Sequence, residues 1–222
     1  MGVSLFPRLD ILPSAQRNLW PELATVSRHS FVLYGGTAVA LYLGHRESVD
    51  FDFFTNRPFQ PDELFADYSF LRDSEVFQSQ PNTLTVLTAG RDTDRVKISF
   101  FGGLRFGRLG PPLRTPDGVM SVASLADLLA HKLKTVLQRV EPKDYLDVDA
   151  MLQNGLSLSS GLAGANLLFP AFSPQECLKA LVYFEDEALH DLPSHLEERL
   201  LRAIKSVRSI PVAVLDSTAL ND

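Results

Sequence analysis

Residues 31–54 read FVLYGGTAVALYLGHRESVDFDFF, and this stretch decides the fold of the first half of the chain. Its first four residues are apolar or aromatic and stop at Gly35 and Gly36, which predicts a buried strand that ends at a turn. The apolar run that follows closes at Gly44, as expected for a short buried helix with a glycine at its C-terminal end. A strand that enters a helix through two glycines leaves backbone N–H groups and the positive end of the helix dipole at one spot. A phosphate group can approach the backbone closely there.

The segment Val49–Phe54 alternates in polarity, so Asp50 and Asp52 are expected on one face of a strand and two phenylalanines on the other. Carboxylates this close repel each other unless a cation lies between them, and hard oxygen ligands suit Mg²⁺ or Mn²⁺. The alternative is a solvated strand face. Because Gly36 precedes Asp50 by fourteen positions, a strand, a helix and a return strand can bring the phosphate-binding turn to the carboxylates, which favours the metal site.

Two segments of the chain resemble one known family. Residues 35–54, GGTAVALYLGHRESVDFDFF, resemble the signature of the AbiEii-type nucleotidyltransferase toxins, which belong to the DNA polymerase beta-like superfamily. Residues 131–147, from His131-Lys132-Leu133 through Arg139 to KDYLD, resemble the helical motif of the same family. The resemblance implies a Mg²⁺-dependent enzyme that moves a nucleoside monophosphate from an NTP onto a hydroxyl group. Several relatives act on RNA, notably on tRNA ends.

The resemblance also implies roles for individual residues. Asp50 and Asp52 are expected to hold the metal, and Lys132 to balance the charge of the phosphates. The full expected site consists of catalytic Asp50, Asp52, Lys132 and Asp144, and of nucleotide-binding Gly35, Gly36, Thr37, Arg46 and Ser48. The expected partners are an NTP, tRNA or another RNA, and an antitoxin protein.

The second segment also has an interpretation from its residues alone. Lys132 lies beside the apolar stripe of an amphipathic helix, where it either contacts phosphate or extends from a half-buried site to solvent. Asp144 and Asp147 are three residues apart, hence on one helix face. Asp144 is either a catalytic group or the partner of Arg139 or Lys143 in a structural ion pair.

One expected group is missing. Enzymes of this superfamily commonly have a third carboxylate on a later strand, and the best candidate strand is Arg95–Phe101. Its alternation places Ser99 at the position of that carboxylate, together with Arg95 and Lys97 on the same face. Serine cannot replace a general base, whose loss typically costs about 10²- to 10⁴-fold in rate. The alternative function is therefore a catalytically weak or inactive protein that binds or senses nucleotides. A small hydroxyl compound as acceptor is a further alternative.

Composition and pattern predict an α+β protein with a small mixed β-sheet, flanking helices and a C-terminal helical lobe, and the resemblance implies that the sheet is a polymerase beta-like nucleotidyltransferase core. We expect residues 1–120 to form the core with a leading helix over 14–26, residues 121–210 the helical lobe, and residues 211–222 a tail. With 45% hydrophobic and 22% charged residues, the chain can bury a core. The single cysteine, Cys177, excludes an internal disulfide and suits the cytoplasm. No targeting signal or membrane-spanning run is visible.

The net charge of −6 argues against a general nucleic-acid coat, but residues 91–114 contain six arginines and lysines against two aspartates. This basic segment is either a surface for triphosphate or RNA, or a set of scattered arginines on a solvated face.

Overall fold

The computed structural model of the protein describes residues 4–90 and 95–221, and these form two compact units. The first unit comprises the chain up to Gly107, Pro111–Ala123, and the residues from Thr218 onward. The second comprises Arg108–Gly110 and Ser124–Ser217. Each unit is described below by itself.

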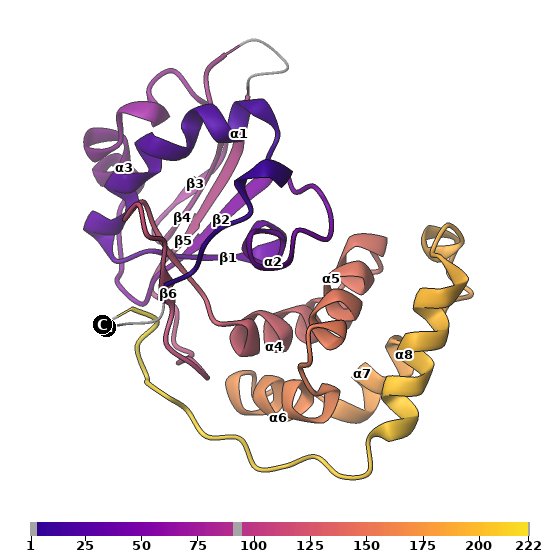
Figure 1. Cartoon of the computed structure of the whole chain (residues 1–222). Coiled ribbons are helices and arrows are strands. Elements are labelled where there is room, and N and C mark those ends of the chain that lie inside the picture. The colour runs from indigo at the N-terminus through magenta and orange to yellow at the C-terminus, as the bar shows by residue number, and fades with distance from the viewer. Residues whose placement is uncertain (1–3, 91–94, 222) are drawn as a thin grey trace. The chain divides into compact units, whose positions relative to one another are not determined.

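The first unit is built on a mixed β-sheet. Within the described residues the sheet has seven strands in the order β3-β4-β5-β2-β1-β7-β6 (Figure 1). Their bounds are β1 Val32–Tyr34, β2 Asp50–Phe54, β3 Glu75–Gln80, β4 Thr83–Leu87, β5 Lys97–Phe101, β6 Leu113–Arg114 and β7 Ser121–Val122. β2 pairs antiparallel with β1 and parallel with β5, and β1 pairs parallel with β7. The predicted α+β class and mixed sheet are confirmed.

The two faces of the central strands differ in burial. Phe51 and Phe53 of β2 are fully buried, as are Ile98 and Phe100 of β5 and the inward residues Leu84 and Val86 of β4. Tyr68, which follows helix α3 (Pro61–Asp67), packs against Phe100 with ring centroids 5.8 Å apart. Asp50, Asp52 and Phe54 alternate with these residues and are partly exposed. β2 therefore has one face in the hydrophobic core and one partly accessible face.

The predicted leading helix is divided in the structure. It consists of the α-helix α1, Ser14–Leu19, followed directly by the 3-10 helix η2, Trp20–His29. Pro21 lies at the start of η2. Because proline has no N–H group and its ring clashes with the carbonyl four residues earlier, an α-helix cannot continue through this position undisturbed. The first unit also contains helix α2, Gly35–Leu43, and two shorter 3-10 helices, η1 Leu9–Ile11 and η3 Ser69–Leu71.

The second unit is helical. Its helices are α4 Leu125–Val136, α5 Pro142–Gln153, α6 Leu158–Leu168, α7 Pro174–Ala180, η5 Glu187–Leu189 and α8 Ser194–Ser206 (Figure 1). Serine caps begin α4 and α7, since Ser124 accepts a hydrogen bond from the Asp127 N–H and Ser173 from the Glu176 N–H. α4 packs on α5 and α6, and the core residues of these helices include Leu129 and Leu133 of α4, Leu162 of α6, and Val148 and Met151 of α5.

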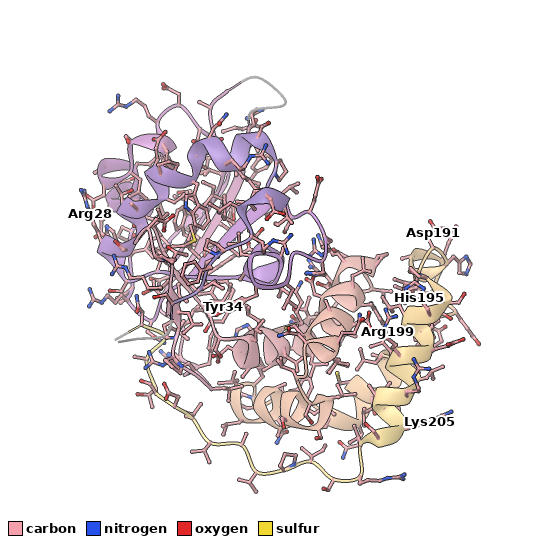
Figure 2. All side chains as sticks on the ribbon, viewed as in Figure 1. Arg28, Tyr34, Asp191, His195, Arg199 and Lys205 are labelled. Carbon is pink, nitrogen blue, oxygen red and sulfur yellow. The ribbon has the colours of Figure 1, made fainter. Side chains whose placement is uncertain are left out.

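Polar contacts fasten the outer parts of the helical unit. Arg199 of α8 (labelled in Figure 2) donates two hydrogen bonds to the carboxylate of Asp149 on α5, and Asp149 is buried. After α8 the chain is extended up to Ser217, where the Arg108 N–H donates to the Ser217 carbonyl and the Asp216 N–H to the Arg108 carbonyl. The Arg108 guanidinium also pairs with Asp216 at 2.8 Å. Arg108 thus holds the end of the extended segment that follows α8.

Candidate active site

The site in the first unit is centred on the junction between β1 and helix α2, Gly35–Leu43. β1 ends at Tyr34 and α2 begins at the next residue, without an intervening loop. Gly35 has φ +74°, and a Cβ atom on it would lie 2.4 Å from Oδ2 of Asp52. Asp52 is the register partner of Tyr34. The strand pairing thus places a carboxylate directly beside the first residue of the helix, and only glycine leaves room for it.

Thr37 and Ser48 hold the return loop against this helix. Their hydroxyl oxygens are 2.8 Å apart, and Thr37 also hydrogen-bonds to the backbone carbonyl of Asp50. Both side chains are buried. The helix closes with Gly44 in the left-handed conformation, φ +62°, as the glycine-cap prediction required. The side chains of Thr37 and Ser48 therefore fix where β2 begins, and the backbone N–H groups of the first helical turn are the groups suited to an anion.

The two aspartates share the accessible face of the sheet with residues of β5. The parallel register pairs Asp50 with Lys97 and Asp52 with Ser99. The Lys97 ammonium lies 4.0 Å from Oδ2 of Asp50, and the Asp50 side chain is 34% exposed. Ser99 is buried beside Asp52. The face on which Ser99 lies and its position next to the carboxylate pair agree with the predicted strand alignment.

The donor set fits a magnesium-type ion. Among the described residues no cluster of three or more His, Cys, Asp or Glu side chains could hold a metal by itself. Mg²⁺ commonly binds to proteins through one or two carboxylates and takes its other ligands from water and substrate phosphates. Asp50 and Asp52, with the helix N-terminus of α2 alongside, provide such an incomplete shell, in which a nucleotide would supply the remaining oxygens.

A second polar cluster lies in the helical unit. The Lys132 ammonium on α4 contacts Asp144 at 2.7 Å and Asp147 at 2.6 Å, and both carboxylates come from α5. Arg139 also donates to Asp144, at 2.9 Å to Oδ2 and 3.3 Å to Oδ1. Lys132 is 8% exposed and both aspartates are fully buried. The Lys132 side chain therefore does not extend freely to solvent, because two carboxylates fix its position.

The protonation state of Asp144 follows from these contacts. Burial by itself would raise its pKa, but the hydrogen bond from Arg139 and the charge and hydrogen bond of Lys132 outweigh that effect, and the pKa of Asp144 is lowered. Asp144 is thus held as a carboxylate at neutral pH. Its partner in the structure is Arg139 rather than Lys143, whose ammonium pairs with Glu141 at 2.9 Å.

The sequence-predicted residues fall into two groups. Gly35, Gly36, Thr37, Ser48, Asp50 and Asp52 lie together in the first unit, and Lys132 and Asp144 lie together in the second. Arg46 donates to the Glu47 carbonyl at 2.8 Å within the return loop. Sequence reasoning assigned no function to Asp147, although its i, i+3 spacing from Asp144 indicated the shared helix face. It also missed the contact of Lys97 with Asp50, which depends on the β2–β5 register.

The predicted basic segment is not a uniform cationic surface. Arg91, Asp92 and Asp94 lie outside the described residues. Arg95 pairs with Glu75 at 2.6 Å, and Arg108 with Asp216. These two arginines have carboxylate partners, which weakens the interpretation of the segment as a surface for RNA.

The fold and the site define a class: a mixed sheet with a glycine turn at a helix N-terminus and two carboxylates on the adjacent strand is suited to transfer of a phosphate-containing group. Comparison with known proteins identifies the family within this class. The family model "Nucleotidyl transferase AbiEii toxin, Type IV TA system" matches residues 23–208. A relative in Aquifex aeolicus (strain VF5), an uncharacterized protein, is 30% identical over 181 residues, which cover 77% of this chain and 82% of that protein. The chain belongs to the AbiEii nucleotidyltransferase toxin family, and it is a nucleotidyltransferase.

No helix in the described part of the chain is long and apolar enough to span a membrane.

Gly35→Ala tests the close approach of the helix to Asp52. The new methyl group would have to displace the Asp52 carboxylate, so we expect nucleotide affinity to fall and transfer to fall by up to about 10²-fold, the scale of a misplacement of about 1 Å at a catalytic group. Isothermal titration with an NTP and Mg²⁺ measures the affinity, and label transfer from an α-labelled NTP measures the rate. Gly155→Ala is the matched control, because Gly155 also has a positive φ, +92°, but no atom within 4 Å of the added Cβ. Equal effects of both substitutions on nucleotide binding would contradict this contact.

Asp144→Asn tests the buried cluster. Removing one carboxylate of a buried pair typically costs about 3–5 kcal/mol, so we expect a loss of that order in the free energy of unfolding by urea at pH 7. Glu176→Gln, which breaks the exposed pair with Lys179, should cost less than about 1 kcal/mol. Because the pKa of Asp144 is lowered in the folded protein, its contribution is present above the ordinary aspartate pKa and is lost as the pH falls through the folded value. The difference in the free energy of unfolding between wild type and Asp144→Asn should therefore shrink in acid. A difference that does not depend on pH would show that the charge of this carboxylate is not its source.

Proposed function

We propose that this nucleotidyltransferase is Mg²⁺-dependent and transfers a nucleoside monophosphate from an NTP to a hydroxyl group of an RNA, with tRNA ends as the first candidates. The observation that carries the proposal is the common position of Asp50, Asp52 and the N-terminus of α2, which the β1–β2 register brings together. A divalent ion held by these carboxylates would offset the negative charge on the triphosphate.

The residues of the first unit would act by positioning. The N–H groups at Gly35, Gly36 and Thr37 face the spot where a phosphate would bind, and the helix dipole favours negative charge there. Thr37 and Ser48 hold the strand that presents the carboxylates. Lys97, next to Asp50, would lie at the phosphate end of the substrate. Arg46 remains a proposed phosphate contact from the return loop.

The reaction itself is a displacement at the α-phosphorus. The acceptor oxygen forms a bond to it, the bond to the β-phosphate oxygen breaks, and pyrophosphate leaves. We propose that Ser99 occupies the position of the carboxylate that would accept the proton of the attacking hydroxyl, and that the proton passes to solvent water instead. Asp144 is a poor acceptor, since its pKa is lowered by its cationic partners. In the helical unit we propose that Lys132 balances charge and that Asp144 is a positioning residue acting through Lys132.

The family description gives the biological setting: AbiEii proteins are toxins of type IV toxin–antitoxin systems. We propose that an antitoxin protein counteracts this chain and that its reaction takes place in the cytoplasm. The second candidate function is nucleotide binding or sensing without transfer. It is favoured by one observation, the serine at the β5 position next to Asp52.

One experiment separates the two functions. The protein is incubated with each α-labelled NTP, Mg²⁺ and total cellular RNA, and the label in RNA is measured. Label in a defined RNA supports transfer, and its position identifies the acceptor. If no NTP donates label while calorimetry still detects metal-dependent nucleotide binding, the sensing function replaces transfer.

Asp50→Asn and Asp52→Asn should each abolish metal-dependent nucleotide binding and leave the fold intact. Each substitution removes one ligand charge from a partly exposed position. Calorimetric titration with NTP, in Mg²⁺ and in EDTA, measures the loss, and circular dichroism checks the fold. Asp62→Asn, on the exposed first turn of α3, is the matched control and should bind like wild type. If both site variants bound NTP in Mg²⁺ with wild-type affinity, Asp50 and Asp52 would not form the metal site.

Ser99→Asp should raise the transfer rate or tighten Mg²⁺ binding. The new carboxylate would lie beside Asp52 in the β2–β5 register, within reach of the metal or of the attacking hydroxyl, and Lys97 on the same face would offset its charge. Label transfer and Mg²⁺ titration measure the two effects. Ser79→Asp, on the exposed strand β3, adds the same group away from this register and should change neither. A folded Ser99→Asp variant with unchanged metal affinity and rate would show that the third acidic group is not located at this position.

A further inference from the structure

The accessible face of β2 and β5 changes in chemistry along the strands. The register pairs are Asp50 with Lys97, then Asp52 with Ser99, then Phe54 with Phe101. The face therefore has charged side chains in its first two pairs and aromatic side chains in the third. The aromatic pair begins one side-chain repeat beyond Asp52, a rise of about 6.6 Å along the strand.

The phenylalanines of this aromatic pair differ in exposure from those of the core. Phe51 and Phe53 on the opposite face are fully buried, whereas Phe54 and Phe101 are partly exposed. Their rings meet edge to face, with centroids 5.4 Å apart. Phe54 also stacks on Tyr34 (labelled in Figure 2), with centroids 4.8 Å apart and planes 13° apart. The pair is thus an aromatic surface on the carboxylate face, with a fixed ring geometry.

The chain beyond the two strands supports this aromatic surface. The Thr55 N–H donates to the Phe101 carbonyl and the Leu104 N–H to the Thr55 carbonyl. The Asn56 side-chain amide donates to the carbonyls of Leu104 and Phe106. The Phe106 ring lies 6.3 Å from that of Phe54 in an edge-to-face arrangement. These hydrogen bonds hold the strand ends and the 104–106 loop in place, so the rings are positioned before any ligand binds.

A nucleotide likewise has its charged triphosphate at one end and its aromatic base at the other. Bases stack on phenylalanine without strict sequence preference, because every base has a π-face. We infer that Phe101, supported by Phe54 and Phe106, is a stacking surface for a nucleobase at this site. The inference rests on the proposed function, since Asp50 and Asp52 set the position of the phosphates. The base belongs either to the donor NTP or to the terminal nucleotide of the acceptor.

The test uses Phe101→Leu, which keeps an apolar side chain but removes the ring, and Phe101→Trp, which keeps a ring. Binding of ATP, GTP, CTP and UTP is compared by calorimetry with binding of inorganic tripolyphosphate, all in Mg²⁺. A single-stranded oligoribonucleotide is titrated separately. Tripolyphosphate reports on the metal and phosphate site alone, because it has no base. Phe77→Leu is the matched control, since Phe77 is a 61% exposed phenylalanine on β3.

We expect Phe101→Leu to weaken base-dependent binding by about fivefold or more, since loss of one stacked base is worth about 1–3 kcal/mol. Tripolyphosphate binding should not change, Phe101→Trp should bind like wild type, and Phe77→Leu should have no effect. A loss confined to the NTPs assigns the base to the donor, and a loss confined to the oligoribonucleotide assigns it to the acceptor.

Two results would overturn the inference, and they differ. If folded Phe101→Leu binds NTPs and oligoribonucleotide like wild type, the stacking surface is wrong while the proposed function stands. If the wild type itself binds neither tripolyphosphate nor any NTP in Mg²⁺, the proposed function is wrong, and the stacking surface is withdrawn with it.

Discussion

The site in the first unit depends on one steric constraint: Asp52 occupies the space in which a side chain at Gly35 would lie. β1 and β2 are paired antiparallel, and the helix begins directly after β1, so its first residue is forced against the neighbouring strand. Glycine accepts both the left-handed backbone and the close contact. The same contact that requires glycine brings a carboxylate to a helix N-terminus, which is an arrangement suited to binding a metal together with phosphate.

Electrostatics separates the two groups of site residues. Asp50 is partly exposed and has one distant cationic neighbour, Lys97 at 4.0 Å, so an additional cation can approach it. Asp144 is buried and already has Lys132 and Arg139. A buried charge costs several kcal/mol unless it is paired, and removing one partner is more damaging than the pair is stabilising. The exposed carboxylates are therefore suited to binding, and the buried ones to holding Lys132 in one position.

Much of the first unit could be predicted from the sequence. The alternation in Val49–Phe54 identified the two faces of β2, and the glycines at 35, 36 and 44 identified the bounds of α2. These features are local, because a strand repeats every two residues and a helix end needs a particular backbone conformation. The leading helix was predicted less well, since apolar periodicity does not distinguish an α-helix from the 3-10 helix that follows Leu19 and contains Pro21. The contact of Asp147 with Lys132 required the structure.

The sequence by itself determined the family, the α+β class, the glycine turn and the carboxylate pair, because each depends on residues close together in the chain. The folded chain decided which residues are direct neighbours: it places Lys97 beside Asp50 and Phe101 beside Phe54, and it pairs Ser99, which the alternation had put on the carboxylate face, with Asp52. All three pairs join strands separated by more than forty residues in the chain. Register between such strands is set by the packing of the buried face, where Phe51, Phe53 and Phe100 lie, and a shift of one residue would turn every side chain to the opposite face. No local pattern contains that information, so the neighbours of the carboxylates could be known only from the folded chain.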